Sequence, residues 1–230
     1  MKVLITGTSR GIGRAAALKF LSEGFNVIGL DIESDTISKS QDAKNKENYS
    51  HFTADISDPS SLPEISDVEI LVNNAGIQTP ALTGGEKDIQ VNLIGTMAVT
   101  QKYAFQPKIK SVLFNASVSA LTGNEFPSYA ASKAGIIGYM KNCAIRLANS
   151  YRATCNAVCF GGVLTELNEN VIKNHDLWQK IMDVTPLKRW ASAQEAADWI
   201  YFLTVTNKFC TGQAIDVSGG ERNCADLFVW

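Results

Sequence analysis

Histidine and cysteine are scarce in this chain, and their scarcity excludes most metal-centred and disulfide-based folds. The 230 residues include 2 His and 5 Cys, and no two Cys are spaced as C-x-x-C. An odd number of thiols without such pairs is typical of a reducing compartment rather than of a disulfide framework. Two His also leave a zinc cluster short of ligands. We therefore expect free thiols and no metal centre.

A surplus of one charge sign and a long apolar run are missing as well. Lys+Arg number 21 against 23 Asp+Glu, a formal net charge of −2, so no basic excess is available for nucleic acid or an anionic bilayer. No segment approaches the ~20 apolar residues of a membrane span, and residues 1–7 are too short for a secretory signal core. We expect a cytoplasmic protein that uses neither nucleic acid nor membrane.

The composition supports a sizeable buried core, because 45% of the residues are hydrophobic and only 6 are proline. Short apolar runs rich in β-branched residues alternate with longer segments of helical period. The expected strands are residues 3–5, 27–30, 51–54, 70–72, 111–114 and 155–159. The expected helices are residues 15–21, 89–103, 130–147 and 193–203. This alternation predicts an α/β fold of the Rossmann type, a doubly wound, mostly parallel sheet with helices on both faces in three layers.

Nothing in the sequence divides the chain into two folding units. Residues 34–50 and 57–67 are polar and are expected as surface connections around a short strand. No Pro/Gly/Ser-rich linker and no internal repeat is present. We expect a single domain over residues 1–230.

A glycine-rich turn follows the first expected strand and leads into the first helix. Residues 6–13 read Thr-Gly-Thr-Ser-Arg-Gly-Ile-Gly. Glycines at such a turn let the backbone approach a pyrophosphate closely, and the helix N-terminus favours its charge. The spacing is G-x-x-x-G-x-G rather than G-x-G-x-x-G, so an ordinary strand-to-helix turn is the alternative. The predicted cofactor-binding residues here are Gly7, Ser9, Arg10, Gly11, Ile12 and Gly13.

Asp31 and Arg10 give opposite indications about the cofactor. Asp31 ends the second expected strand, where a carboxylate accepts hydrogen bonds from the adenosine ribose hydroxyls and repels a 2′-phosphate. Arg10 lies in the glycine loop, where a guanidinium could pair with that phosphate. We predict NAD, with NADP as the less favoured alternative; for Asp31 the other possibility is a solvated carboxylate at a strand end.

Tyr129 and Lys133 are four residues apart at the start of a helical pattern, which puts them on one helix face. A cation beside a phenol lowers the phenol pKa from ~10 toward neutrality and makes it a general acid or base. Such a pair also occurs by chance in exposed helices. Ser117, with Ser119 as a nearby alternative, follows the preceding strand at the sheet edge where ligands bind. We predict that Ser117 hydrogen-bonds a substrate carbonyl to which Tyr129 gives its proton.

These motifs together resemble the short-chain dehydrogenase/reductase family in its compact single-domain form. The resemblance covers almost the whole chain, and its motifs occur in order: the glycine loop, Asp55, Asn73-Asn74-Ala75-Gly76, Asn92, Ser117 and Tyr129-x-x-x-Lys133. It implies that Lys133 binds the nicotinamide ribose and depresses the Tyr129 pKa, and that Asn92 holds a water in a proton relay. The implied catalytic set is Ser117, Tyr129, Lys133 and Asn92. The further cofactor-binding residues that it implies are Asp55, Ile56, Asn74, Ala75, Gly76, Tyr129, Lys133, Gly162, Val163 and Thr165.

Two features depart from the family's pattern. Phe160 stands before Gly161 where the family usually has proline, which removes a constraint on the backbone φ angle and adds a ring. The connections 55–73 and 76–92 are short, which predicts trimmed helices there.

Two segments bear on the substrate side. The resemblance predicts a substrate lid at about residues 165–190, whose apolar side chains recur at helical spacing and form either a substrate surface or a packed face. These side chains are Leu177, Trp178, Ile181 and Met182. The tail after Gly220 ends in four apolar residues, 227–230. It is expected to cover the substrate cleft, to pack on another subunit or to dock on its own domain.

The predicted function is that of an NAD(H)-dependent oxidoreductase passing a hydride between nicotinamide and a secondary alcohol or ketone, with Tyr129 as general acid/base. The alternative enzyme is an NADPH-dependent 3-ketoacyl-thioester reductase, which Arg10 favours and Asp31 opposes. An alternative of another class is a non-catalytic NAD-binding sensor or partner subunit, although a pure binder needs no proton relay. The expected partners are a small-molecule alcohol or carbonyl substrate and, by resemblance, further copies of the chain in a homo-oligomer (dimer or tetramer).

Overall fold

Seven parallel strands form the central sheet of the computed structural model, which describes residues 1–222. The tail after Gly220 was expected to cover the cleft, to pack on another subunit or to dock on its own domain. Most of it, residues 223–230, lies outside the described residues. The strands are β1 (Lys2–Thr6), β2 (Asn26–Asp31), β3 (Tyr49–Thr53), β4 (Ile70–Asn73), β5 (Ser111–Asn115), β6 (Thr154–Phe160) and β9 (Ala214–Val217). Their order across the sheet is β3-β2-β1-β4-β5-β6-β9. Strands are added outward on one side from β1 to β3, and the order then reverses, switching to the other side of β1 at β4. Ligands of such sheets bind at this reversal, outside the carboxyl ends of the strands.

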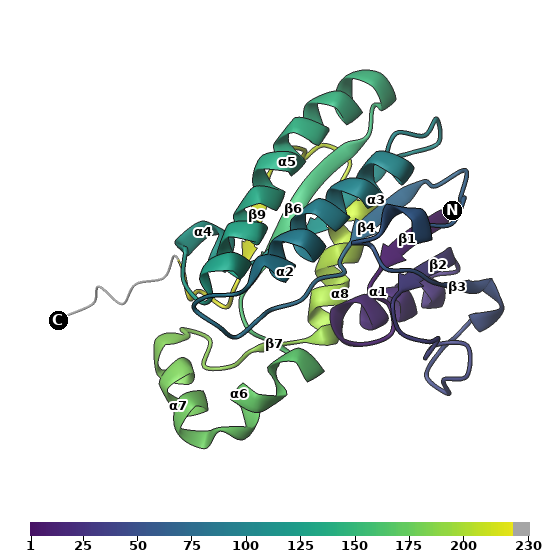
Figure 1. Cartoon of the computed structure of the whole chain (residues 1–230). Helices are drawn as coiled ribbons and strands as arrows, with labels where there is room; N and C mark the ends of the chain where they lie inside the picture. Colours follow the sequence, from purple (N-terminus) through teal and green to yellow (C-terminus); the bar gives the residue numbers. More distant parts are fainter. Residues whose placement is uncertain (223–230) are drawn as a thin grey trace.

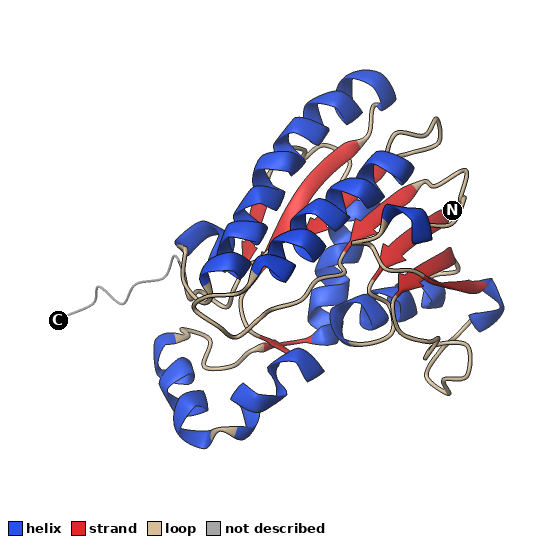
Figure 2. Ribbon diagram, viewed as in Figure 1, coloured by secondary structure: helices blue, strands red, loops and turns tan. Residues whose placement is uncertain are grey.

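Helices cover both faces of the sheet and give three layers (Figures 1 and 2). On one face lie α1 (Gly11–Ser22) and α8 (Ala193–Tyr201), and on the other α3 (Thr96–Tyr103) and α5 (Pro127–Tyr151). The central strands are apolar on both sides, as strands covered by helices must be. This arrangement confirms the predicted α/β fold.

The sheet faces divide the core into two clusters. Leu4 of β1 packs toward the α3 and α5 side, whereas Val3 and Ile5 pack toward the α1 and α8 side. Phe20 of α1 is fully buried against the second cluster. Successive residues of β1 pack on alternate faces because successive side chains of a strand point to opposite sides of the sheet.

The long helix α5 carries Tyr129 to the carboxyl edge of the sheet. Pro127 occupies its first position, where the missing N–H costs no hydrogen bond and the fixed φ angle suits a helix start. Its other end closes on Arg152, which has φ 55°. Tyr129 therefore lies in the first turn, and Tyr151 in the last turn lies at the opposite edge of the sheet.

The predicted helix over residues 89–103 is interrupted by a wider turn. The structure has α2 (Glu86–Asp88), then η3 (Ile89–Gly95), which is π-helical, and then α3. Gly95 approaches the Ile56 carbonyl so closely that a Cβ would lie 2.8 Å from its oxygen. Wider turns of this kind are frequent at functional sites, and this one contains Asn92.

The prediction that residues 34–50 and 57–67 are plain surface connections is wrong in part. Ile37 is fully buried, and Leu62 and Ile65 are also in the core, because apolar side chains in these polar stretches anchor the connections to the sheet. The helical segments in the two stretches are η1 (Lys46–Asn48) and η2 (Pro59–Ser61), each of three residues. The trimmed crossover between β3 and β4 is therefore confirmed.

The segment predicted to be a substrate lid, about residues 165–190, lies beyond the carboxyl ends of the strands (Figure 1). It contains η4 (Glu166–Asn168), α6 (Glu169–Lys173) and α7 (His175–Val184), and it is flanked by β7 (Val163–Leu164) and β8 (Ala191–Ser192). Trp178 of α7 packs edge-on against Trp190, with ring centroids 5.0 Å apart. Met182 is buried, whereas Leu177 is 40% exposed. The α7 face is thus a packed face along one part only.

Two short helical segments complete the described chain, α4 (Ser119–Thr122) and η5 (Phe202–Thr206). Phe160 extends β6 and is buried, pairing with Val217 of β9. The ring that replaces the expected proline therefore belongs to the core. Among residues 1–222, none of the helices combines the length and apolar character needed to cross a membrane.

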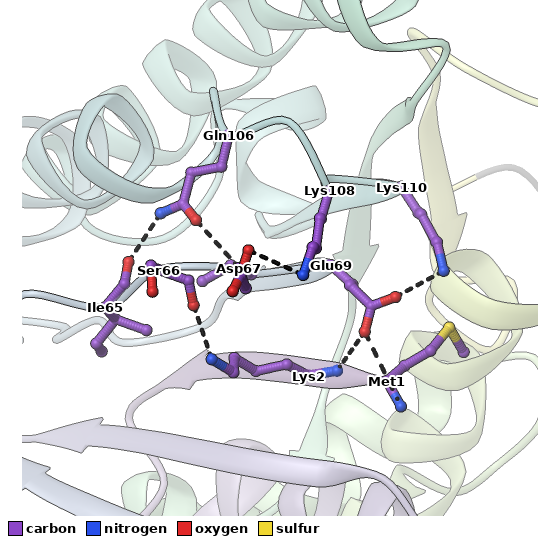
Figure 3. Close-up of polar contacts among 10 residues, drawn as sticks. Met1, Lys2, Ile65, Ser66, Asp67, Glu69, Gln106, Lys108 and Lys110 are labelled. Atoms are coloured by element: carbon purple, nitrogen blue, oxygen red, sulfur yellow. Dashed lines mark hydrogen bonds and ion pairs between the residues drawn. The ribbon is translucent and has the colours of Figure 1, made fainter.

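The amino ends of the strands carry a network of charged and amide side chains (Figure 3). Glu69 accepts hydrogen bonds from the Lys110 Nζ (2.6 Å) and the Lys2 backbone nitrogen (2.8 Å). Lys108 pairs with Asp67 at 3.1 Å. Gln106 donates to the Ile65 carbonyl at 2.9 Å. These contacts tie together the chain segments that enter β1, β4 and β5.

Candidate active site

The turn between β1 and α1 is shaped so that only glycine fits at its key positions. Gly7 has φ +75°, and a Cβ there would lie 2.9 Å from the Ala75 Cα. A Cβ on Gly13 would collide with the Gly7 carbonyl oxygen. The turn delivers the N-terminus of α1 at the sheet reversal, with no side-chain cap on its first N–H groups. Such a cradle fits a pyrophosphate, whose charge the free N–H groups and the helix dipole favour.

Asp31 lies beside this turn, as predicted. Its Oδ2 accepts a hydrogen bond from the Ser9 backbone nitrogen at 2.8 Å, and its Oδ1 accepts one from the Glu33 nitrogen at 2.9 Å. The carboxylate therefore joins the glycine turn to the segment after β2. Arg10 is exposed and pairs with Glu33, the Nη2 to Oε1 distance being 3.6 Å.

Asn74 ties the segment after β4 to the glycine turn. Its Nδ2 donates to the carbonyl oxygens of Thr6 (3.0 Å) and Gly7 (3.2 Å). The Ala75 nitrogen donates to the Thr6 hydroxyl at 3.0 Å. A Cβ on Gly76 would lie 3.3 Å from the Lys133 Nζ, so this glycine lies between the cofactor turn and the catalytic candidates.

Asp55 and Ile56 lie in the segment that follows β3. The Asp55 Oδ1 accepts hydrogen bonds from the Ser57 nitrogen (2.9 Å) and hydroxyl (2.7 Å), which closes a tight turn after β3. Ile56 is buried in the core, 6% exposed. A cofactor role for these two positions stays a prediction.

Lys133 is the most deeply buried cation of the site. It is 4% exposed, and its Nζ donates to the Asn115 carbonyl at 2.8 Å and lies 5.7 Å from the centre of the Tyr129 ring. Burial lowers the pKa of Lys133 to about 8. The nearby Asp88, itself fully buried, acts in the opposite direction. The predicted pairing of phenol and ammonium on one helix face is therefore present.

In the chain without cofactor or substrate, Lys133 does not bring the pKa of Tyr129 toward neutrality, contrary to expectation. Burial of the phenol raises the pKa of Tyr129 to about 12. A hydrogen bond with Ser117 lowers this pKa, and the Glu125 and Asp88 carboxylates raise it. Desolvation of the phenolate outweighs the other contributions, because a buried anion loses its hydration.

Ser117 and Ser119 are hydrogen-bonded to each other, and the choice between them as the substrate contact stays a prediction. The Ser117 hydroxyl donates to the Ser119 hydroxyl at 3.0 Å, and the Ser119 nitrogen donates back to the Ser117 Oγ at 3.1 Å. Both residues are buried. Ser119 also hydrogen-bonds Glu125, which accepts from the Gln78 Nε2 at 2.8 Å. No sequence signal pointed to Glu125, which has φ 72° in the loop before α5.

Asn92 is fully buried, and its amide holds neighbouring backbone in place. Its Oδ1 accepts from the Ile77 nitrogen and its Nδ2 donates to the Ile77 carbonyl, both at 2.8 Å. The Nδ2 also donates to the Ser132 hydroxyl at 3.0 Å, which donates to the Tyr129 carbonyl at 2.7 Å. Asn92 thus connects to Tyr129 through one side chain, and its relay water stays a prediction.

Thr165, at the start of the predicted lid, lies against the glycine turn. The Thr165 methyl lies 3.5 Å from where a Cβ on Gly11 would be. Val163 is buried in β7, and a Cβ on Gly162 would collide with the Trp190 indole. A hollow of about 450 Å³ opens between α1 and the lid, lined by Gly11 and Thr165 among others. Thr165 and the glycine turn therefore lie together at the carboxyl edge of the sheet. Within residues 1–222, no group of three or more His, Cys, Asp or Glu side chains could hold a metal ion.

Known proteins resemble this chain over nearly its full length. A family model described as enoyl-(acyl carrier protein) reductase matches residues 7–221. The chain is 31% identical over 240 residues to a 3-oxoacyl-[acyl-carrier-protein] reductase of Staphylococcus epidermidis, covering 94% of this chain and 97% of the relative.

Solved structures are similar over nearly the full length. A 4-hydroxyisoleucine dehydrogenase complexed with NADH superposes with a TM-score of 0.84 at 27% identity, covering 96% of this chain and 98% of the other. A putative 2-deoxy-D-gluconate 3-dehydrogenase from Agrobacterium tumefaciens with bound NADP gives a TM-score of 0.82 at 26% identity, covering 96% and 95%. Similar folds thus hold nicotinamide cofactors of both kinds.

Proposed function

The chain belongs to the short-chain dehydrogenase/reductase family of oxidoreductases, and we propose that it uses NAD(H) to interconvert a secondary alcohol and the matching ketone. The observation that carries this proposal is the arrangement at one sheet edge. Tyr129, Lys133 and Ser117 lie together there, and the segment 74–76 connects them to the glycine turn. A proton-transfer group and a dinucleotide cradle side by side are what hydride transfer to a carbonyl requires.

The residues present fit a nicotinamide dinucleotide. The glycine turn and the free N–H groups of α1 suit its pyrophosphate, and Asp31, beside that turn, would accept hydrogen bonds from the adenosine ribose. When bound, the cofactor supplies or accepts a hydride at its nicotinamide ring. Val163 and Thr165 would border that ring, at the start of the lid.

The chain's own contribution is to hold the carbonyl and move a proton. In reduction, the Ser117 hydroxyl hydrogen-bonds the substrate carbonyl oxygen, and the Tyr129 phenol gives its proton to that oxygen as it becomes an alcohol. In oxidation the same phenol accepts the proton. Lys133, a buried cation beside the ring, stabilises the phenolate formed in reduction.

The preference for NAD rests on Asp31. Its carboxylate lies at the end of β2, next to the turn that would hold the adenosine phosphates, where it would repel a 2′-phosphate. The second candidate is an NADPH-dependent 3-ketoacyl-thioester reductase. It is favoured by the curated relative from Staphylococcus epidermidis, which carries the name 3-oxoacyl-[acyl-carrier-protein] reductase.

We also propose that the chain works as one catalytic unit with residues 165–190 as a substrate lid. The apolar face of α7, with the exposed Leu177 at one end, suits a small alcohol or carbonyl substrate. Assembly into a homo-oligomer is part of the same proposal.

Titration of NADH and NADPH against intrinsic tryptophan fluorescence tests the cofactor assignment. NADH should bind more tightly than NADPH in the wild type, and Asp31→Ala should remove most of that preference. Asp67→Ala, an exposed carboxylate at the opposite sheet edge, serves as the matched control and should leave the preference unchanged.

A panel of ketones and secondary alcohols on the same sample then tests turnover. Tight NADPH binding together with turnover of 3-ketoacyl thioesters would replace the NAD proposal with the second candidate. Cofactor binding without turnover of any panel member would favour a non-catalytic NAD-binding protein.

A further inference from the structure

Arg10 and Glu33 form an ion pair at the adenosine end of the predicted cofactor site. The Nη2 to Oε1 distance is 3.6 Å, and the side chains are 64% and 51% exposed. An exposed pair contributes little to folding stability. The position of the pair bears on cofactor binding, because Arg10 is the cation of the glycine turn and its guanidinium is paired with the Glu33 carboxylate.

The backbone of Glu33 is fixed in relation to the glycine turn by three contacts. Its nitrogen donates to the Asp31 Oδ1 at 2.9 Å, and its carbonyl accepts from the Ser9 hydroxyl at 3.4 Å. The His51 Nε2 lies 3.0 Å from the same carbonyl. A carbonyl only accepts hydrogen bonds, so the Nε2 donates to it, and the His51 Nδ1 lies 3.2 Å from the Tyr49 hydroxyl. The carboxylate of Glu33 is therefore presented to Arg10 by an anchored segment.

Resting on the proposed use of a nicotinamide dinucleotide, we infer that Glu33 is a second selectivity residue, which engages Arg10 and so withholds that cation from a 2′-phosphate. Asp31 acts at the ribose itself. Glu33 acts one step outward, by neutralising the guanidinium that would otherwise compensate for Asp31. Selectivity against the phosphorylated cofactor is thus divided between two carboxylates that share one anchored segment.

A double-mutant cycle on the full chain tests this inference by binding alone. The measured quantity is the ratio of the NADPH Kd to the NADH Kd from tryptophan fluorescence, in the wild type, Glu33→Gln, Arg10→Ala and the double variant. Glu33→Gln should lower the ratio about fivefold, the effect of one unit charge on a dianionic phosphate several ångströms away across water. Arg10→Ala alone should change it less than twofold, because its charge is already neutralised.

The double variant shows whether the effect of Glu33 acts through Arg10. Adding Arg10→Ala to Glu33→Gln should remove most of the fivefold gain, and raising the salt concentration should shrink the gain because the pair is exposed. Glu64→Gln, a carboxylate paired with Lys102 away from the site, is the matched control and should leave the ratio unchanged.

Two results would overturn the inference while leaving the proposed function standing. One is an unchanged ratio in Glu33→Gln, and the other is a gain that persists in full without Arg10. If the wild type binds neither cofactor, the proposed function itself fails and the inference falls with it.

Discussion

At the amino ends of the strands the Glu69 carboxylate lies near the surface with several partners, whereas at the carboxyl ends the Lys133 ammonium is buried with one hydrogen-bond partner. Glu69 has three cationic or N–H neighbours within 4 Å. Burial acts to raise its pKa, but Lys110 and the Lys2 backbone lower the pKa of Glu69 on balance. Lys133 at the other end has one hydrogen bond, to a carbonyl, and burial lowers its pKa to about 8.

This difference indicates where function has been favoured over stability. A paired charge near water neither gains nor loses much free energy on folding. Burying a cation is unfavourable for folding, and groups with strongly shifted pKa values, such as Lys133 and Tyr129, gather at active sites. We therefore propose that the carboxyl edge carries the chemistry, whereas the amino edge holds the chain segments together.

The largest expected effect compares two tyrosines of the same helix, α5. Tyr129→Phe should lower turnover by about 10³-fold, because a positioned general acid contributes ~10²–10⁴ to rate. Tyr151→Phe at the opposite edge removes only a 3.2 Å hydrogen bond to the Phe105 carbonyl and should leave turnover within a factor of two. Steady-state kinetics with an active panel substrate measures both. Equal losses in the two variants would contradict the assignment of the edges.

The next effect compares two lysines by their stability. Lys133→Met should raise the free energy of unfolding at pH 7 by about 2 kcal/mol, because it removes a buried cation whose pKa is lowered by burial. Lys110→Met should lower it by less than about 1 kcal/mol, since its pair with Glu69 is half exposed. Urea denaturation measures both changes. A destabilised Lys133→Met would show that the hydrogen bond to the Asn115 carbonyl outweighs the burial of the charge.

The pH dependence of stability sharpens the same comparison. Between pH 8 and 10 Lys133 keeps its proton in the unfolded chain and loses it in the folded chain. Because the unfolded state then binds more protons, the free energy of unfolding of the wild type rises with pH over this range. Above pH 10 the opposite holds for Tyr129, which stays protonated when folded. The gap between wild type and Lys133→Met should therefore narrow as pH rises from 8 to 10 in urea melts. A constant gap would mean that the Lys133 pKa is not lowered.

The last prediction concerns the carboxylate at the amino edge. Glu69→Gln should lower the free energy of unfolding by about 1 kcal/mol, because it removes the charge that Lys110 and the Lys2 backbone share. Cofactor affinity should not change. Thermal melts and NADH titration check the two statements, and a large loss of NADH affinity would mean that the two edges are not independent.

Much of the fold could be predicted from apolar runs, because strands buried on both faces leave a strong signal. Strand β9 was missed, since its four residues are only half-buried at the sheet edge and form no apolar run. The wider turn at Asn92 was also missed. It accompanies the close packing of Gly95 on the Ile56 carbonyl, a contact between segments distant in sequence.

The candidate site could be predicted as a set of residues but not as an electrostatic environment. Spacing alone placed Tyr129 and Lys133 on one face, and the structure confirms that they are neighbours. Burial is a property of the whole fold, so the raised Tyr129 pKa could not be predicted from the pair. Glu33 and Glu125 were missed for the same reason, because their partners come from other segments.

Hydrogen–deuterium exchange with and without NADH tests most directly which edge of the sheet holds the site. Bound NADH should slow exchange in residues 6–13, 73–76 and 115–119, which meet at the carboxyl edge. Exchange in residues 65–69 and 106–110 at the amino edge should stay unchanged. Protection at the amino edge, or no protection at the glycine turn, would contradict the account.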